Sequence, residues 1–311
     1  MTGTTPSERI VETYVVTGGT RGIGYGISRE LLLRGQNVFL CGRSETSVNR
    51  AIKKLEEAAV GEGTSGGRVG GIPCDISSYD DVQKLWDAAI AKFGTVHVWI
   101  NNAAIDPHAP LLLSPSGGGG TKGKDEDKTK NLRHVEQINQ CIDINIKGAV
   151  NCCRVAIQGM KKQQQHSGGT ERKYRVYLME GLGSDGSIRS SITMVYGMTK
   201  YAGTYLANAI EKDLSSSEEY KNISLGRMQP GMVTTDLLLS SMTDGEKSAE
   251  EIESTKKIFN ILADKEETVT PWIADQLVEG NNLAIRWLTT GSVLFRFVKS
   301  LFVKRDLFED E

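Results

Sequence analysis

Short apolar runs of strand length alternate along this chain with longer segments in which apolar residues recur every three or four positions. The strand-like runs are residues 14–16, 37–41, 69–74, 96–100, 175–179 and 223–228, and the segments of helical periodicity are residues 23–33, 45–59, 79–93, 135–161 and 194–214. Strands that alternate with helices in this way form a parallel sheet covered by helices. The pattern therefore predicts an α/β fold with a doubly wound parallel sheet, helices on both of its faces and a mostly helical C-terminal extension.

Two stretches interrupt this alternation. Residues 114–130 are rich in glycine and mixed charge, and residues 61–67 are a shorter stretch of the same kind. Such sequences bury too little apolar surface to offset the entropy lost on ordering. We expect both to be surface insertions, the first of them flexible, and a functional lid is the less favoured alternative for residues 114–130.

The composition is that of an ordinary globular protein, with 39% hydrophobic and 24% charged residues in a chain of 311. A net charge of −2 argues against nucleic acid as a partner. The five cysteines and four histidines show no spacing typical of metal ligands, so we expect buried or free thiols in a reducing compartment and no metal. No targeting segment is visible, which is consistent with a cytoplasmic protein or with a mature form.

A glycine-rich segment, Thr-Gly-Gly-Thr-Arg-Gly-Ile-Gly at residues 17–24, follows the first strand and opens the first helix. Gly18 suits a tight turn, Gly22 allows the backbone to approach a pyrophosphate, and Gly24 allows close packing of the helix. The helix N-terminus then offers free N–H groups to phosphates. This context favours a dinucleotide-binding turn of the Rossmann type over an ordinary strand-to-helix connection.

The choice between the two nicotinamide dinucleotides follows from charge. A carboxylate at the end of the second strand would bind a ribose 2′-hydroxyl, but that strand ends in Cys-Gly-Arg-Ser at residues 41–44. Arg43 and Arg21, beside which we expect no acid, could grip a 2′-phosphate. We therefore expect NADP(H), and the alternative is that either arginine lies in solvent.

Tyr196 and Lys200 lie four residues apart in a segment of helical periodicity, so they share one face of a helix. A phenol ordinarily titrates near pH 10, which is too high for efficient acid–base catalysis at neutral pH. A neighbouring ammonium group favours the phenolate, so we expect Lys200 to lower the pKa of Tyr196.

Together these features resemble the short-chain dehydrogenase/reductase family over nearly the whole chain. The matching landmarks are residues 17–24, Asp75, residues 101–104 (Asn-Asn-Ala-Ala), residues 145–148 (Asn-Ile-Lys-Gly), Tyr196 with Lys200, and residues 230–235 (Pro-Gly-Met-Val-Thr-Thr). The resemblance implies that Tyr196 is the general acid/base, that Lys200 holds the nicotinamide ribose, that a serine polarises the carbonyl and that Asn145 anchors a water of a proton relay. It also implies a homo-oligomer formed through the helices that carry Asn145 and Tyr196.

The same resemblance implies a set of cofactor-binding residues distributed over the loops that follow the strands. These are Thr17, Gly18, Thr20, Arg21, Gly22, Ile23, Gly24, Arg43, Ser44, Asp75, Ile76, Asn102, Ala103, Tyr196, Lys200, Pro230, Gly231, Val233 and Thr235.

Three departures from the family pattern stand out. The serine that usually lies 13 residues before the tyrosine is replaced by Gly183, so Ser184 is the candidate and Ser187 the second choice. The asparagine motif ends in Ala104 instead of glycine. The usual last strand with an Asp-Gly-Gly ending is missing, and residues 283–288 are the candidate for that strand.

These departures are themselves similar to the chlorophyll(ide) b reductases, the non-yellow-coloring subfamily of plants and green algae. The similar segments are residues 99–102, 181–187, 195–200, 230–240, 257–262, 267–269 and 287–289, and the tail that ends in Leu-Phe-Glu-Asp. This resemblance implies NADPH-dependent reduction of the 7-formyl group of chlorophyll b to 7-hydroxymethyl, in the chloroplast at the thylakoid surface. The alternatives are a reductase or dehydrogenase of another apolar carbonyl (lipid, steroid or retinoid) and a catalytically silent NADP-binding scaffold or redox sensor.

The tail over residues 293–305 has apolar residues at helical spacing, with basic residues between them. Such a helix lies at a membrane surface or packs on the domain or a partner subunit, and the sequence leaves both open. Met232, Leu237, Leu238 and Leu239 either line an apolar substrate pocket or pack together. With no repeat or linker, we predict a single domain over residues 1–311, with a cofactor-binding core at 13–233 and a substrate lid and amphipathic extension at 234–311.

Overall fold

A seven-stranded sheet forms the centre of the protein in the computed structural model, which describes residues 10–63, 66–107, 124–166, 172–186, 193–243 and 249–308. The strand order is β3-β2-β1-β4-β5-β6-β9, and every neighbouring pair is parallel. The strands are β1 (Thr13–Val16), β2 (Asn37–Gly42), β3 (Val69–Pro73), β4 (Val98–Asn101), β5 (Tyr174–Met179), β6 (Ile223–Gln229) and β9 (Ala284–Arg286). β9 lies within the predicted stretch 283–288 and completes the sheet beside β6.

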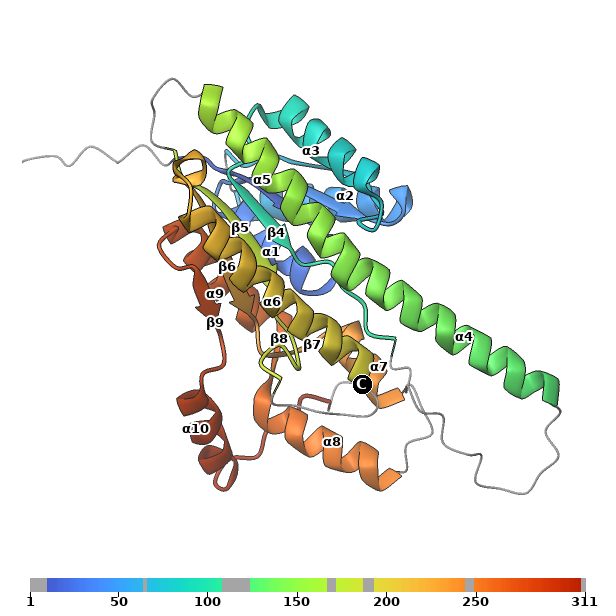
Figure 1. Cartoon of the computed structure of the whole chain (residues 1–311). Coiled ribbons are helices and arrows are strands. Elements are labelled where there is room, and N and C mark those ends of the chain that lie inside the picture. Colours follow the sequence, from blue (N-terminus) through green and yellow to red (C-terminus); the bar gives the residue numbers. More distant parts are fainter. Residues whose placement is uncertain are drawn as a thin grey trace, which may run out of the picture.

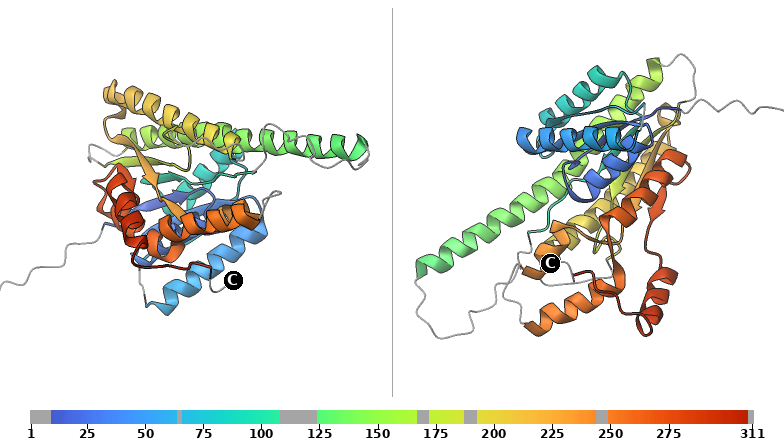
Figure 2. Two further views of the ribbon diagram at one scale, coloured as in Figure 1. Left: turned by 90° about the horizontal axis from the view of Figure 1, so that it is seen from below. Right: turned by 180° about the vertical axis from the view of Figure 1, so that it is seen from behind.

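Helices cover both faces of this sheet, as the alternation of strands and helices predicted (Figures 1 and 2). On one face α1 (Gly22–Leu33), α2 (Glu45–Gly61) and α9 (Glu266–Glu279) enclose an apolar core with the inward side chains of β1 and β2. On the other face α3 (Tyr79–Phe93), α5 (Ala149–His166) and α6 (Met194–Ser215) enclose a second core. The doubly wound fold is confirmed.

The helix predicted over residues 135–161 is longer than its periodicity indicated. α4 (Lys124–Ile142) continues through a π-helical segment, η1 (Asp143–Gly148), into α5 (Figure 1). Residues 124–130, which the composition predicted as part of a loop, thus belong to a helix. Lysine and glutamate are good helix formers, and a helix already nucleated downstream extends through them at little cost. Residues 114–123 lie outside the described residues, as do residues 64 and 65 of the shorter insertion.

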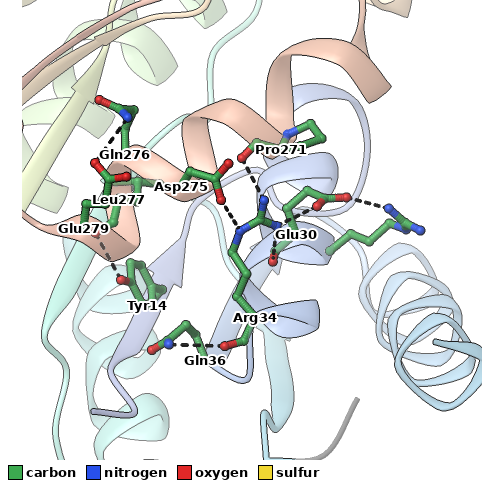
Figure 3. Close-up of polar contacts among 10 residues, drawn as sticks. Tyr14, Glu30, Arg34, Gln36, Pro271, Asp275, Gln276, Leu277 and Glu279 are labelled. Carbon is green, nitrogen blue, oxygen red and sulfur yellow. Dashed lines mark hydrogen bonds and ion pairs between the residues drawn. The ribbon is translucent and has the colours of Figure 1, made fainter. Parts of the chain in front are cut away.

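Helix α9 packs along α1, and an arginine joins the two (Figure 3). Arg34 donates from Nε to Asp275 (2.8 Å) and from Nη2 to the carbonyl oxygen of Pro271 (3.0 Å), and it also pairs with Glu30 of its own helix (2.7 Å). The C-terminal part of the chain thus supplies a helix and a strand to the main core, in addition to the elements beyond the sheet.

The remaining elements that follow β6 in sequence lie beyond the carboxyl ends of the strands (Figure 1). β7 (Met232–Thr234) and β8 (Ala263–Lys265) form a small parallel sheet, and α7 (Asp236–Thr243), α8 (Ala249–Leu262) and α10 (Thr290–Ser300) surround it. A short 3-10 helix, η2 (Glu218–Tyr220), precedes β6. Among the helices of the described ranges, none combines the length and the apolar character needed to cross a membrane.

Candidate active site

The glycine-rich turn between β1 and α1 is held in place by the end of β4. Thr17 Oγ1 accepts hydrogen bonds from the backbone N–H groups of Asn102 and Ala103, both at 3.1 Å. The side-chain amide of Asn102 donates to the carbonyl oxygens of Thr17 (2.9 Å) and Gly18 (3.2 Å). Asn102 and Thr17 therefore shape the turn that was predicted to bind a dinucleotide.

The turn has the backbone that a phosphate cradle requires. Gly18 and Gly22 adopt φ angles of +64° and +55°, which favour glycine. A side chain on Gly24 would collide with the amide of Asn102 and the carbonyl oxygen of Gly18. α1 then begins at Gly22, and the side chain of its N-cap residue, Arg21, makes no capping hydrogen bond, which leaves the helix N-terminus available to an anion. These features fit a pyrophosphate.

Three of the predicted cofactor-binding residues, Thr20, Arg43 and Ser44, lie around the end of β2. Thr20 packs against Gly42, where an added Cβ would lie 2.6 Å from Thr20 Cγ2. Arg43 is exposed directly after β2, and Ser44 caps α2 by accepting from the N–H of Ser47 (3.3 Å).

Arg21 has an acidic partner that the sequence did not reveal. It forms an exposed ion pair with Asp236 (3.3 Å), a residue 215 positions away. The expectation that no acid lies near Arg21 was therefore wrong, because the β7–α7 connection returns to the glycine turn. The pair is highly exposed, with 72% and 77% of the two side chains accessible, and is correspondingly weak.

The turn after β3 holds two of the predicted cofactor-binding residues, Asp75 and Ile76. Asp75 Oδ1 accepts from the N–H (2.9 Å) and hydroxyl (2.8 Å) of Ser77, which shapes the turn into α3. Ile76 is buried against Gly148 of the π-helical segment. Ile76 thus lies between the strand ends and the helix that carries Asn145.

The predicted cofactor-binding residues of the segment 230–235 approach the glycine turn from the other side. Pro230 and Val233 are buried, and Gly231 has a φ of +76°. A Cβ on Gly22 would lie 3.5 Å from Thr235 Cγ2, so the two predicted cofactor segments face each other. Ile23, in the first turn of α1, is half-buried against the core beside them.

Tyr196 and Lys200 lie on the buried side of α6, as their spacing predicted. The hydroxyl of Tyr196 lies beside Gly181, where an added Cβ would be 2.5 Å from it. Lys200 Nζ donates to the carbonyl oxygen of Met179 (3.1 Å) and lies 5.5 Å from the centre of the Tyr196 ring.

A cavity beside Lys200 brings together two predicted catalytic residues, Asn145 and Lys200, and some of the predicted cofactor residues, whereas Tyr196 and Ser184 do not line it. Its walls include Thr17, Ile76, Ala103, Asn145, Glu180 and Lys200. These residues come from the ends of β1, β3, β4 and β5 and from the helices η1 and α6. Parallel strands bring their carboxyl ends to one edge, which is where ligands of open α/β sheets bind.

Burial controls the protonation of both residues. It raises the pKa of Tyr196 well above its usual value, and the charge of Asp106 and the thiol of Cys141 add to that effect. It lowers the pKa of Lys200 to about 8, against the opposing effects of Cys141 and Glu180. The pKa of Tyr196 is thus shifted in the direction opposite to the one expected from Lys200, and desolvation of the buried phenolate is the largest cause.

The position of the shifted serine has a steric explanation. Gly183 has a φ of +89°, and a Cβ there would lie 2.8 Å from the Cα of Gly197 on α6. Ser184, one residue later, is buried, and its Oγ accepts from the N–H of Gly181 (2.9 Å). Ser184 thus lies in the same turn as the glycine that touches the Tyr196 hydroxyl, and Ser187 lies outside the described residues.

Asn145 lies in the π-helical segment, a distortion found frequently at functional sites. Its amide accepts from the N–H of Ile105 (2.9 Å) and donates to the carbonyl oxygen of Ile105 (2.8 Å) and to Thr199 Oγ1 (3.0 Å). Thr199 in turn donates to the carbonyl oxygen of Tyr196 (2.7 Å). Asn145 and Thr199 therefore connect the end of β4 to the helix that carries the tyrosine.

Thr199 was missed in the sequence, together with Cys141, whose thiol lies 3.3 Å from Nδ2 of Asn145. The only signal for Thr199 was a hydroxyl between Tyr196 and Lys200.

All five cysteines are buried thiols, as expected. Four apolar residues after β6 were expected either to line a pocket or to pack together. Three of them, Met232, Leu238 and Leu239, pack against a cluster formed by Phe259 and Ala263. The fourth, Leu237, is exposed.

The fold and this site define the class of protein. A family model described as short chain dehydrogenase matches residues 12–170, and the chain belongs to this family of oxidoreductases. The probable chlorophyll(ide) b reductase NYC1 of Arabidopsis thaliana is 31% identical over 309 residues, covering 96% of this chain and 54% of the relative. The chlorophyll(ide) b reductase NOL of Oryza sativa subsp. japonica is 31% identical over 265 residues, covering 85% and 65%. The chain thus spans between half and two thirds of the length of these relatives.

Solved structures agree with the fold. An alcohol dehydrogenase from Thermococcus sibiricus complexed with 5-hydroxy-NADP superposes with a TM-score of 0.63 at 17% identity, covering 89% of this chain and 94% of its own. A 3-ketoacyl-(acyl-carrier-protein) reductase from Brucella melitensis complexed with NADH gives a TM-score of 0.64 at 18% identity, covering 88% and 95%.

Proposed function

We propose that this protein is an NADPH-dependent carbonyl reductase that converts the 7-formyl group of chlorophyll b or chlorophyllide b to 7-hydroxymethyl. The observation that carries the proposal is the cavity at the strand ends, which joins Thr17 of the glycine turn to Asn145 and to Lys200, the partner of Tyr196 on α6. The chlorophyll(ide) b reductases among the relatives support the choice of substrate.

The residues of the site can supply the proton and bind the oxygen in such a reduction. NADPH, when bound, supplies the hydride that adds to the carbonyl carbon. Tyr196 donates its phenolic proton to the carbonyl oxygen, and the raised pKa keeps that proton in place at neutral pH. Ser184 stabilises the developing negative charge on the oxygen, and Lys200 holds the ribose and stabilises the tyrosinate left after transfer. Asn145 anchors a water through which the proton is replaced.

NADPH is proposed over NADH because Arg43 is exposed after β2, with no carboxylate at the end of that strand. The proposed contacts are the glycine turn with the pyrophosphate, Asp75 and Ile76 with the adenine, and Val233 and Thr235 with the nicotinamide amide. Arg43→Ala should weaken binding of NADPH and leave binding of NADH unchanged, as measured by fluorescence titration of each cofactor.

The function is tested by incubating the full chain with NADPH and either chlorophyll b or chlorophyllide b and following the 7-hydroxymethyl product by chromatography. Product should form with the wild type, and Tyr196→Phe should lower its rate by at least about a hundredfold. Cofactor binding should remain in Tyr196→Phe, which separates lost chemistry from lost folding.

Two other results would each replace the proposal. Turnover of lipid, steroid or retinoid carbonyls without any chlorophyll product would identify another apolar carbonyl as the substrate. Binding of NADPH without turnover of any carbonyl, with no effect of Tyr196→Phe, would identify a silent NADP-binding scaffold or redox sensor.

The compartment and assembly follow from the same proposal. The relatives whose names carry the word chloroplastic support a location in the chloroplast, and the proposed position there is the thylakoid surface. α6 exposes Met198, Tyr201 and Tyr205, which supports a homo-oligomer formed through this helix. Light scattering of the wild type and of Tyr205→Glu measures that assembly.

A further inference from the structure

Helix α10 turns its apolar side chains away from the rest of the protein. The side that faces the domain carries Ser292, Val293, Arg296 and Ser300, which are half-buried. The outward side chains are Leu294, Phe295, Phe297 and Val298, and they continue into Leu301, Phe302 and Val303, all exposed and with Phe302 83% accessible. A surface helix ordinarily places its apolar side against the core, so this reversed orientation indicates an apolar partner outside the chain.

Polar contacts hold the helix in this orientation. Arg296 donates to the carbonyl oxygen of Leu262 (3.1 Å) and pairs with Asp264 (2.7 Å). Arg305, beyond the helix, donates to the carbonyl oxygen of Ala263 (3.0 Å) and pairs with the same Asp264 (3.1 Å). The apolar side chains are thus presented from an anchored segment, and their exposure does not result from a detached tail.

The charge of this segment indicates what the partner is. Residues 290–305 contain four basic residues and no acidic one. Asp264 offsets one of the two arginine charges, and Lys299 and Lys304 are both exposed beside the apolar side chains. Two copies of so basic a face would repel each other in a twofold contact, which disfavours a second copy of this chain.

We propose that residues 294–304, the docking face, bind the surface of a lipid bilayer that contains anionic lipids. Exposed leucine, phenylalanine and valine would enter the boundary between headgroups and acyl chains, and Lys299 and Lys304 would meet the anionic headgroups. The chain beyond the face folds back over α8, where Leu307 and Phe308 join the cluster of Met232, Leu238 and Phe259. Docking would therefore bring α7 and α8, and the edge of the sheet that holds the site, toward the membrane (Figure 1).

The test is co-sedimentation of the full chain with vesicles of phosphatidylcholine, with and without about one third phosphatidylglycerol, in about 0.1 M salt. The wild type should bind the anionic vesicles. Leu294→Glu combined with Phe302→Glu should lower the partition coefficient at least about tenfold, since two large apolar side chains no longer enter the bilayer. The matched control is Ile10→Glu with Val60→Glu, which makes the same charge change at two residues that are each 81% exposed elsewhere, and which should bind like the wild type.

Lys299→Gln with Lys304→Gln should lower binding to the anionic vesicles about tenfold and leave binding to neutral vesicles unchanged. Tyr196→Phe should bind like the wild type, so vesicle binding is independent of the proposed reaction. Wild type that stays in the supernatant, or a Leu294→Glu/Phe302→Glu variant that binds as well as the wild type, would overturn the proposal. A wild type that binds no vesicle but loses an oligomer in that variant would show that the docking face is a protein interface.

Discussion

At the scale of single residues, the site depends on close contacts that leave no room for other side chains. The Tyr196 hydroxyl packs against Gly181, and Gly183 packs against Gly197. The turn after β5 therefore lies directly on α6, with backbone against backbone at two glycines. This contact accounts for the absence of a serine at position 183 and for the burial of Ser184 one residue later.

Restoring the family's usual serine with Gly183→Ser should destabilise the protein by about 3 kcal/mol and should not raise activity. The substitution combines the strain of a φ of +89° with a Cβ 2.8 Å from Gly197 Cα. Gly63→Ser is the control, since Gly63 has a φ of +63° but nothing within 4 Å, and it should cost about 1 kcal/mol. Equal losses in denaturant unfolding of the two variants would contradict the steric explanation.

Lys200→Met should abolish activity and yet stabilise the protein at neutral pH. Burial lowers the pKa of Lys200 to about 8 from its usual value of 10.5. The unfolded chain therefore binds this proton more tightly than the folded protein does. Below pH 8 the lysine is charged in both states, and its burial lowers the free energy of unfolding by the full amount. This loss of stability disappears as the pH rises from 8 toward 10.5. The full shift corresponds to about 3 kcal/mol, and partial exposure reduces the expected gain to about 2 kcal/mol.

Thermal unfolding of wild type and Lys200→Met between pH 6 and pH 10.5 measures this difference, which should shrink above pH 8. Lys161→Met is the matched control on α5, because Lys161 is paired with Glu219 (2.5 Å) and that pairing raises its pKa. The control should lose a little stability at neutral pH. A Lys200→Met protein that is less stable than the wild type at pH 7 would contradict the prediction.

At the scale of elements, the site is a junction of β4, η1 and α6. The π-helical segment places Asn145 between the backbone of Ile105 and the hydroxyl of Thr199. All three elements contribute side chains to one apolar core, and this junction sets the position of Tyr196 relative to the strand ends. Thr199 is a positioning residue in this arrangement.

Thr199→Val should lower kcat about tenfold with little change in the KM for cofactor, because the tyrosine helix loses its connection to Asn145 while the glycine turn is untouched. Stability should fall by roughly 1 kcal/mol. Thr270→Val, a buried threonine that donates to the carbonyl oxygen of Glu266 (3.0 Å), should lose similar stability without changing kcat. Steady-state kinetics of both variants measure kcat and the KM for cofactor. A change in the KM of Thr199→Val without a change in its kcat would rule out the positioning role of Thr199.

At the scale of the whole molecule, the two edges of the sheet serve different purposes. At the amino-terminal edge Arg175 pairs with Glu12 and donates to the carbonyl oxygen of Leu277 (3.0 Å), which fastens β5 and the end of α9 to the start of the chain. At the carboxyl edge the β7–β8 sheet carries the segment opposite the glycine turn, and Asp264 of β8 holds the C-terminal tail. Polar contacts thus stabilise the amino-terminal edge of the sheet, and the candidate active site lies at the carboxyl edge.

Asp264→Asn should destabilise the protein by about 2 kcal/mol and expose the tail to trypsin. Burial alone would raise the pKa of Asp264, but hydrogen bonds from Arg296, Trp287 and Arg305 outweigh it and hold the pKa below its usual value. The carboxylate therefore contributes stability at neutral pH that is lost as the pH falls below about 4 through the lowered pKa. The expected loss is smaller than for a fully buried pair, because Arg305 is 36% exposed.

Thermal unfolding at pH 7 and pH 3, with trypsin digestion at pH 7, measures this effect. Asp275→Asn is the control, since its carboxylate pairs with Arg34 but is 54% exposed, and it should cost under about 1 kcal/mol. An unchanged digestion pattern in Asp264→Asn would show that the tail is held by its apolar contacts alone.

The alternation of apolar runs and helical periods determined the parallel sheet, and short motifs determined which loops meet. Local signals suffice for these features: parallel strands end at one edge, and i, i+4 spacing puts Tyr196 and Lys200 on one face of a helix. The weak strand β9 was found only as the remaining candidate, and the helical start of α4 was missed because its composition resembles that of a loop.

The sequence by itself determined the fold, the glycine turn and the spacing of Tyr196 and Lys200, because each depends on residues close together in the chain. Only the tertiary structure decided the protonation of that pair, the ion pair of Arg21 with Asp236, the bridge of Asn145 to Thr199 and the outward side of α10. These features depend on burial and on contacts between segments far apart in sequence. Neither can be read from periodicity, because desolvation and packing are properties of the surroundings that the folded chain creates.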